Sequence, residues 1–268
     1  FGWFESSAPL IDDPAALRTR LEEEGYLYLP GYLDTDLVTA ARERLLGQLD
    51  ELGMVDRTHP VSEGVAQQPW QGRSCHDLVQ QNAPLRELLY AGRMMDFYRL
   101  RAIGPGHGTA PHVDSVYMNR GSQRLLTSWT PLMEITPEIG GLTIMPGSHR
   151  LDRLKKHYTG DVDTFCTNQP DRPPQDVHEW IGPLGDGKLS GHPARLQSKL
   201  GLPWRTAERY RPGDVVIFKI FTVHGSLDNH SDRIRLSTDS RYQPAMNRRT
   251  NVGLAKTRSA IIGPSARG

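Results

Sequence analysis

The feature that most constrains the fold of this chain is a series of short strand-like segments in its second half. From about residue 96 onward, runs that alternate or are rich in β-branched residues are separated by Gly, Pro and Asn. Short strands spaced by turn residues are typical of a β-sandwich or barrel, and nothing alternates regularly enough for βαβ units. The runs are FYRLRAI, residues 111–118, RLLTSWTPLMEI, GLTIM, DVVIFKIFTV and RIRLSTDSRY.

The first third of the chain predicts helices instead. Asp13-Pro14 is a helix start, because a capping side chain precedes a proline in the first turn, and Gly25 offers a left-handed stop. A second helix is predicted from about residue 34 to 52, ending at Gly53, and a third at residues 84–89. Between the first two helices, residues 26–29 read as a short strand.

These patterns predict one domain, mainly β with flanking helices, that spans residues 1–268. Its helical N-terminal part covers about residues 10–95, and its β core covers about residues 96–245. An insertion at about residues 150–209 is rich in charge, Gly and Pro. A loop of that length inside a compact domain is usually a lid or a binding loop.

Composition excludes several classes of protein. The net charge of +1 gives no general case for nucleic-acid or membrane partners. The sequence contains no run of eighteen apolar residues, so no membrane-spanning helix is predicted. The opening FGWFESSAPL lacks the basic and apolar segments of a secretory signal. Two cysteines, Cys75 and Cys166, make a disulfide framework unexpected, so the sequence favours a cytoplasmic protein.

Two histidine-containing segments could carry chemistry. His112-Val113-Asp114 follows a Gly/Pro-rich loop and opens a strand-like run, in which residues two apart point to the same face. His224 ends the apolar run 214–223, which places it at the rim of a core. Each has a plainer interpretation: a surface His and Asp in the first case, and a hydrogen-bonded structural histidine in the second.

Taken together with Arg235, these residues make chemical sense. Two neutral imidazoles and one carboxylate on one face of a metal leave three positions open, as in non-haem Fe(II) oxygenases. A turn-rich cluster follows His224, so an adjacent antiparallel strand can bring Arg235 back beside it. A guanidinium is the side chain best suited to a 2-oxo acid's distal carboxylate in an apolar barrel. Alone, Arg235 would read as a surface salt bridge.

The chain resembles the phytanoyl-CoA dioxygenase family of 2-oxoglutarate oxygenases over roughly residues 25–242. Four passages, in family order, carry the resemblance: the H-V-D motif at 112–114, Trp129 in TSWTPLMEI, the GGLTIMPGSH turn at 140–149, and Pro212-Gly213-Asp214 leading to His224 and to Arg235 eleven residues later. The insertion at residues 150–209 matches no family pattern.

The resemblance implies a fold and a set of roles. The fold is a double-stranded β-helix, a jelly-roll or cupin-like core with helices packed on its outer sheet. His112, Asp114 and His224 would hold Fe(II), and Arg235 would bind the distal carboxylate of 2-oxoglutarate. Trp129 would pack near this cosubstrate or serve only as core, and Thr109 and Ser237 are further candidate contacts. His149 in the PGSH turn is interpreted as structural.

The resemblance also implies a reaction. With Fe(II), 2-oxoglutarate and O2, such enzymes hydroxylate an unactivated C–H and release succinate and CO2. An acid at Asp114 favours hydroxylation over halogenation, while desaturation, epimerisation and ring closure remain alternatives. The predicted substrate is a small organic molecule, a natural-product intermediate. Candidate substrate contacts are Tyr117, Arg120 and Arg124.

Other interpretations stay open at this point. The basic cluster of the insertion could meet an anionic group or form a solvated face; it comprises Arg150, Arg153, Lys155, Lys156 and His157. The same His-Asp-His set could serve a zinc hydrolase, which would have no need of Arg235. A non-catalytic jelly-roll binding protein is a third reading. The oligomeric state is not predicted.

Overall fold

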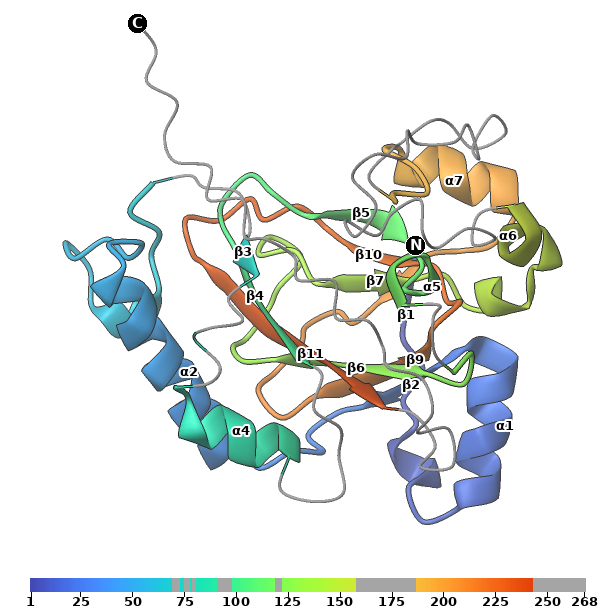
Figure 1. Ribbon diagram of the computed structural model, residues 1–268, viewed down its shortest axis with the longest axis horizontal. Helices are drawn as coiled ribbons and strands as arrows, with labels where there is room; N and C mark the ends of the chain where they lie inside the picture. The colour runs from blue at the N-terminus through green and yellow to red at the C-terminus, as the bar shows by residue number, and fades with distance from the viewer. Residues whose placement is uncertain are drawn as a thin grey trace, which may run out of the picture.

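A computed structural model describes residues 1–68, 73–74, 78, 81–90, 98–118, 122–157 and 187–242 of the chain. Its centre is a pair of facing β-sheets (Figure 1). The larger sheet has the order β2 (Tyr26–Leu29), β9 (Val215–Lys219), β6 (Leu126–Pro131), β11 (Arg235–Tyr242), β4 (Tyr98–Ile103) and β3 (Arg73–Ser74). All of its pairings are antiparallel.

The smaller sheet carries the residues of greatest chemical interest. Its order is β1 (Gly2–Trp3), β8 (Arg205–Thr206), β7 (Leu142–Ile144), β10 (His224–Ser226) and β5 (Thr109–His112). Only the β1–β8 pair in it is parallel. Two mostly antiparallel sheets with few helices confirm the predicted fold class, a mainly β double-stranded β-helix with flanking helices.

Helices cover the outside of this core. At one side of the larger sheet, α2 (Thr35–Glu51) and α4 (Ala83–Tyr90) pack on each other, and α1 (Pro14–Glu24) lies apart from them and contacts β2 (Figure 1). Further helices among the described residues are α5 (Ser115–Met118), α6 (Asp152–His157) and α7 (Pro193–Leu200), with short 3-10 turns at Ala8–Leu10, Val61–Glu63 and Ser148–Arg150.

The N-terminal helices begin and end as their sequences predict. The Asp13 carboxylate accepts the backbone N–H groups of Ala15 and Ala16, and Gly25 ends α1 at a φ of 80°. Asp34 caps α2 in the same way, and Gly53 follows that helix at a φ of 69°. The buried face of α2, which includes Leu45 and Leu49, belongs to the main hydrophobic core.

Two predicted strands were wrong in extent. The strand expected over residues 111–118 ends at His112, and a turn into α5 follows. The run 214–223 forms a strand only as far as Lys219; the chain then crosses between the sheets, and His224 begins β10. Ile220 and Val223 are buried in the crossing. Apolarity reports burial, so it could not show where the strand stops.

That the whole chain forms a single domain stays a prediction. Strand β2, from the helical N-terminal part, pairs with β9 and so belongs to the larger sheet. The insertion at about residues 150–209 contains α6 and α7, whose contact includes hydrogen bonds from Arg153 to the carbonyls of Lys199 and Leu200. Its middle, residues 158–186, lies outside the described residues, as do Cys75 and Cys166.

A glycine allows a close approach of two backbone segments at one end of the smaller sheet. Gly140 has a φ of 81°, and a Cβ there would lie 2.4 Å from the Leu227 carbonyl oxygen and 2.5 Å from that of Asp228. Gly53 also has a positive φ, but a Cβ on it would meet nothing within 4 Å. The two positions therefore share the backbone requirement and differ only in steric space.

We expect Gly140→Ala to lower the free energy of unfolding by more than about 3 kcal/mol, because left-handed strain of about 1–2 kcal/mol adds to a clash with backbone atoms that cannot rotate away. Gly53→Ala should lose only the strain, about 1 kcal/mol. Urea denaturation of the two variants beside the parent measures both values. Equal losses at the two sites would show that the contact around Gly140 yields easily.

Candidate metal centre

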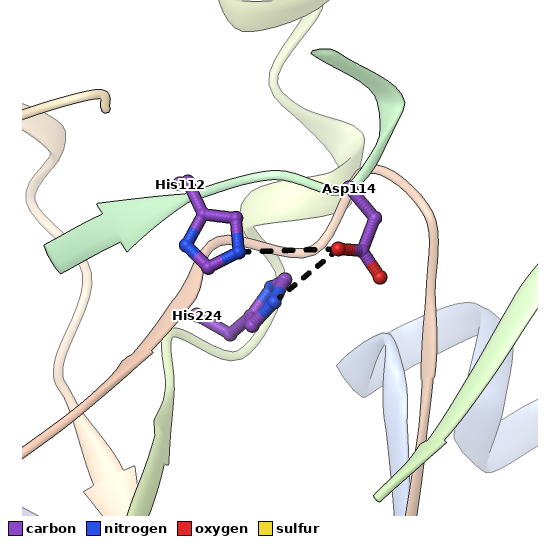
Figure 2. Close-up of side chains that lie close together, drawn as sticks. All are labelled: His112, Asp114 and His224. Carbon is purple, nitrogen blue, oxygen red and sulfur yellow. Dashed lines mark ion pairs between the residues drawn. The ribbon is translucent and has the colours of Figure 1, made fainter. Parts of the chain in front are cut away.

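Three predicted ligands meet between the two sheets. His112 ends β5, His224 begins β10, and the two are direct partners in the register of the smaller sheet. Asp114 follows two residues after β5, and its Oδ1 lies 3.9 Å from His112 Nε2 and 3.7 Å from His224 Nε2 (Figure 2). One ligating atom of each residue lies within 4.8 Å of the others. The residues are thus gathered as the sequence predicts, although Asp114 reaches the site from a turn.

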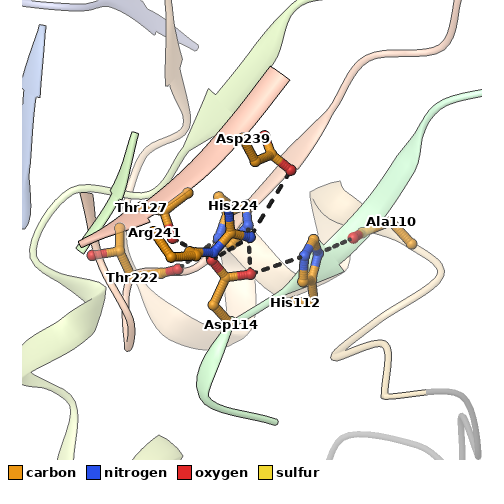
Figure 3. A network of polar contacts seen from close by, with 8 residues as sticks. All are labelled: Ala110, His112, Asp114, Thr127, Thr222, His224, Asp239 and Arg241. Atoms are coloured by element: carbon orange, nitrogen blue, oxygen red, sulfur yellow. Dashed lines mark hydrogen bonds and ion pairs between the residues drawn. The ribbon is translucent and has the colours of Figure 1, made fainter. Parts of the chain in front are cut away.

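Hydrogen bonds orient both imidazoles toward this point. His112 Nδ1 lies 2.9 Å from the Ala110 carbonyl oxygen, and His224 Nδ1 lies 2.9 Å from that of Thr222 (Figure 3). A carbonyl only accepts, so each Nδ1 carries a proton, and in the neutral imidazole the lone pair is then on Nε2. The Phe218 ring, 4.4 Å from that of His224, packs against the second imidazole. The two Nε2 atoms are therefore oriented as metal ligands would be.

The protonation states fit a cation. Burial lowers the pKa of His224, which favours the neutral imidazole that a metal requires. Burial by itself would raise the pKa of Asp114, but the Arg241 guanidinium, the two neighbouring imidazoles and the Thr127 hydroxyl hold it well below its usual range. One carboxylate and two imidazoles, all buried, are the donor set of a non-haem ferrous centre.

Two residues of this network were missed by sequence reasoning. Arg241 Nη2 lies 3.0 Å from Asp114 Oδ2, and the Thr127 hydroxyl donates to the same oxygen at 2.5 Å (Figure 3). Asp239 lies 3.9 Å from Arg241 Nη2. The available signal was the alternation in β11, which puts the charged residues 235, 239 and 241 on one face of a strand.

Contrary to the prediction, the strand that carries Arg235 does not pair with the strand of His224. It lies on β11 in the larger sheet, whereas His224 lies on β10 in the smaller one, so the expected pairing of adjacent strands was wrong. Its side chain is buried, and Nη1 donates to the carbonyls of Gly140 and Leu227. Leu227 directly follows β10, so Arg235 spans the gap between the sheets.

The predicted cosubstrate contacts occupy three strands. Ser237 shares the face of Arg235, and its buried hydroxyl has no hydrogen-bond partner among the described residues. Trp129 is buried against Tyr210, with ring centroids 4.8 Å apart. Thr109 lies three residues before His112, so regular alternation would put the two side chains on opposite faces of β5. A register shift offsets this spacing, because Thr109 pairs with Ser226 while His112 pairs with His224. Their role toward a cosubstrate stays a prediction.

The remaining candidates are less informative. Arg124 is exposed in the turn before β6, and its backbone N–H bonds the Ser122 hydroxyl. Tyr117 lies on α5, but its side chain and the whole of Arg120 fall outside the described residues. His149 bonds the Glu22 carbonyl through Nε2, 2.9 Å away, which agrees with the structural role expected of it.

Fold and site together define a class. A double-stranded β-helix with two histidines and one aspartate gathered between its sheets is the architecture of a non-haem metal oxygenase. A model of the phytanoyl-CoA dioxygenase (PhyH) family matches residues 21–237, and the chain belongs to that family. The resemblance found in the sequence is confirmed, as is the enzyme class, an iron- and 2-oxoglutarate-dependent oxygenase.

Individual relatives have informative names. The chain is 29% identical over 276 residues to the 1-deoxypentalenic acid 11-beta-hydroxylase of Streptomyces exfoliatus, an alignment that covers 90% of this chain and 85% of that protein. Among solved structures, it is similar to the non-heme alpha ketoglutarate dependent carbocyclase SnoK from nogalamycin biosynthesis, with a TM-score of 0.56, 20% identity, and coverage of 89% and 87%.

A second solved structure adds to the evidence for the fold. This is the epimerase SnoN in complex with Fe3+, alpha ketoglutarate and nogalamycin RO, with a TM-score of 0.50 and 24% identity over 87% of this chain and 85% of that one.

In the part of this chain that the structure describes, no helix is long and apolar enough to cross a membrane.

Proposed function

We propose that this chain is an Fe(II)- and 2-oxoglutarate-dependent hydroxylase in which His112, Asp114 and His224 hold the metal. The observation that carries the proposal is the buried convergence of His112 Nε2, His224 Nε2 and Asp114 Oδ1, with each Nδ1 occupied by a carbonyl. When bound, Fe(II), 2-oxoglutarate and O2 supply the oxidation: one oxygen atom enters the substrate C–H, and the other enters succinate as CO2 leaves.

Arg235 is the residue we assign to the distal carboxylate of 2-oxoglutarate. Its guanidinium is buried between the sheets, where an unpaired carboxylate would be very costly. Arginine keeps its charge and offers donors in a planar fork, which suits a carboxylate. The Ser237 hydroxyl, two residues along the same face of β11, is a second donor to this end of the cosubstrate.

The rest of the chain contributes position and exclusion of water. A second hydrophobic cluster joins the ligand-bearing segments to the insertion: Val113 lies between two ligands, Val223 precedes the third, and both pack with residues of α6 and α7. The backbone N–H of Leu189 also donates to the Pro111 carbonyl, 2.7 Å away. We propose that the described parts of this insertion, α6, α7 and the segment that begins at residue 187, cover the metal end of the barrel, where a dry site strengthens charge interactions.

The substrate we propose is a small organic molecule, a natural-product intermediate. Support comes from the names of the relatives: a hydroxylase of 1-deoxypentalenic acid, and enzymes of nogalamycin biosynthesis. Hydroxylation is the outcome we favour, with desaturation, epimerisation and ring closure as alternatives that begin with the same hydrogen abstraction. We further propose that the enzyme works in the cytoplasm, without a nucleic-acid or membrane partner.

The test is a comparison of metals in the absence of oxygen. Adding Fe(II) and then 2-oxoglutarate to the metal-free protein is expected to produce a visible charge-transfer band, which Zn(II) cannot give. Admitting O2 should then convert 2-oxoglutarate slowly to succinate even without substrate, and a chelator such as EDTA should stop it. No band and no succinate would leave a zinc hydrolase or a non-catalytic binding protein as the better reading.

A further inference from the structure

Residues of the larger sheet hold one carboxylate oxygen of Asp114, Oδ2. Its Oδ1 faces the two Nε2 atoms, while Oδ2 accepts from the Thr127 hydroxyl at 2.5 Å and forms an ion pair with Arg241 Nη2 at 3.0 Å (Figure 3). Both contacts are nearly inaccessible to water, because the side chains of Arg241 and Asp114 are each 2% exposed. The two oxygens of one carboxylate therefore have separate partners.

The two residues that hold Oδ2 form a matched pair. Thr127 on β6 and Arg241 on β11 are direct partners in the register of the larger sheet, so their side chains project on the same face. His112 and His224 are likewise direct partners in the smaller sheet. The site is thus built from two cross-strand pairs, one in each sheet, and Asp114 connects them.

The guanidinium of Arg241 is committed to this contact. Its Nε and Nη1 have no hydrogen-bond partner among the described residues, and Asp239 lies 3.9 Å from Nη2, beyond hydrogen-bond distance. Burying a charge is costly unless a counter-charge lies close by, and Asp114 supplies it. A position this costly in the core indicates a purpose beyond packing.

We propose that Arg241 and Thr127 are positioning residues for the metal ligand Asp114. By occupying Oδ2, they fix the carboxylate so that Oδ1 alone faces the metal, which makes Asp114 a ligand through one oxygen and keeps the remaining positions open. This inference rests on the proposed metal site and adds the residues that shape it. Partners of ligating carboxylates contribute typically 10–100-fold to metal affinity.

The test measures the dissociation constant for Co(II), a visible-absorbing stand-in for Fe(II), in the full-length protein. We expect Thr127→Val to weaken Co(II) binding about 10-fold and Arg241→Met about 100-fold, with Arg241→Lys in between because one donor and the charge remain. The Thr127→Val/Arg241→Met double variant should lose less than the product of the two factors, because both residues hold the same oxygen.

Two controls separate positioning from stability. Thr130→Val makes the same chemical change on the opposite face of β6, and Leu236→Ala removes core packing on the opposite face of β11. Both should lower the melting temperature and leave the Co(II) dissociation constant unchanged. If Arg241→Met does not fold, Arg241→Lys and Thr127→Val carry the comparison.

The outcomes are distinct. Unchanged or tighter Co(II) binding in Thr127→Val and the Arg241 variants, or weakening no greater than in the two controls, overturns the positioning role and leaves the metal site standing. A parent protein that binds no Co(II) instead refutes the proposed function itself. Graded loss with rescue by lysine supports the proposal.

Discussion

Changing His224 to alanine is expected to reduce the conversion of 2-oxoglutarate to succinate at least about 100-fold. His224 Nε2 is one of the three candidate ligand atoms in the cluster, and its Nδ1 is already bonded to the Thr222 carbonyl. Outer partners of ligands contribute 10–100-fold, so loss of a ligand should cost at least as much. The measurement is succinate formed by the Fe(II)-loaded protein in air, which requires no knowledge of the substrate.

His149→Ala is the matched control for this change. His149 is also a buried histidine whose ring nitrogen meets a backbone carbonyl, that of Glu22 at 2.9 Å, but the described metal cluster does not include it. The control should lower thermal stability and keep the rate of succinate formation. Retained turnover in His224→Ala, or equal loss in both variants, would contradict the assignment of His224 as a metal ligand.

Asp114→Asn tests the acid ligand with the least disturbance. Removing the side chain would leave the Arg241 charge buried without its partner, and breaking a buried pair costs about 3–5 kcal/mol. The amide also removes the counter-charge, but it keeps the shape and one carbonyl oxygen as an acceptor, so it should cost less stability than loss of the whole side chain. Succinate formation should still fall at least about 100-fold, since a neutral oxygen is a weaker ligand. Full activity in this variant would argue against Asp114 as a ligand.

Local features of the fold were readable from the sequence because local residues determine them. Asp13, Gly25 and Asp34 act on neighbouring backbone groups, so capping chemistry located the first two helices to within a residue or two. The candidate metal ligands rest on a different kind of evidence. H-x-D is weak alone, and the order of four passages along the chain made His112, Asp114 and His224 a set.

Features that depend on how the strands assemble into two sheets could not be predicted from the sequence. The apolar run 214–223 contains β9 and the segment that crosses from the larger to the smaller sheet. Both are buried, so hydropathy does not mark the end of the strand at Lys219. For the same reason the sequence could not show that His224 and Arg235 lie in different sheets. Arg241 was missed because its partner, Asp114, is far from it in sequence and belongs to the opposite layer.

Arg235→Met should weaken the binding of 2-oxoglutarate at least about 30-fold while leaving metal binding intact. Loss of one partner of a buried, hydrogen-bonded charge pair costs about 2–5 kcal/mol, which corresponds to roughly 30-fold or more. Arg235→Lys keeps the charge but loses the planar fork, so we expect an intermediate effect. The measurement is the growth of the charge-transfer band as 2-oxoglutarate is added to the Fe(II)-protein without oxygen.

The neighbouring Arg233→Met is the matched control, because Arg233 is exposed and lies two residues before Arg235. It should bind 2-oxoglutarate like the parent. Arg235 also donates to the carbonyls of Gly140 and Leu227, so its loss is expected to lower stability as well. Co(II) binding separates the two effects: a variant that keeps its metal affinity and loses only 2-oxoglutarate has lost a cosubstrate contact. Unchanged 2-oxoglutarate affinity in both Arg235 variants would mean that this guanidinium holds the two sheets together and nothing more.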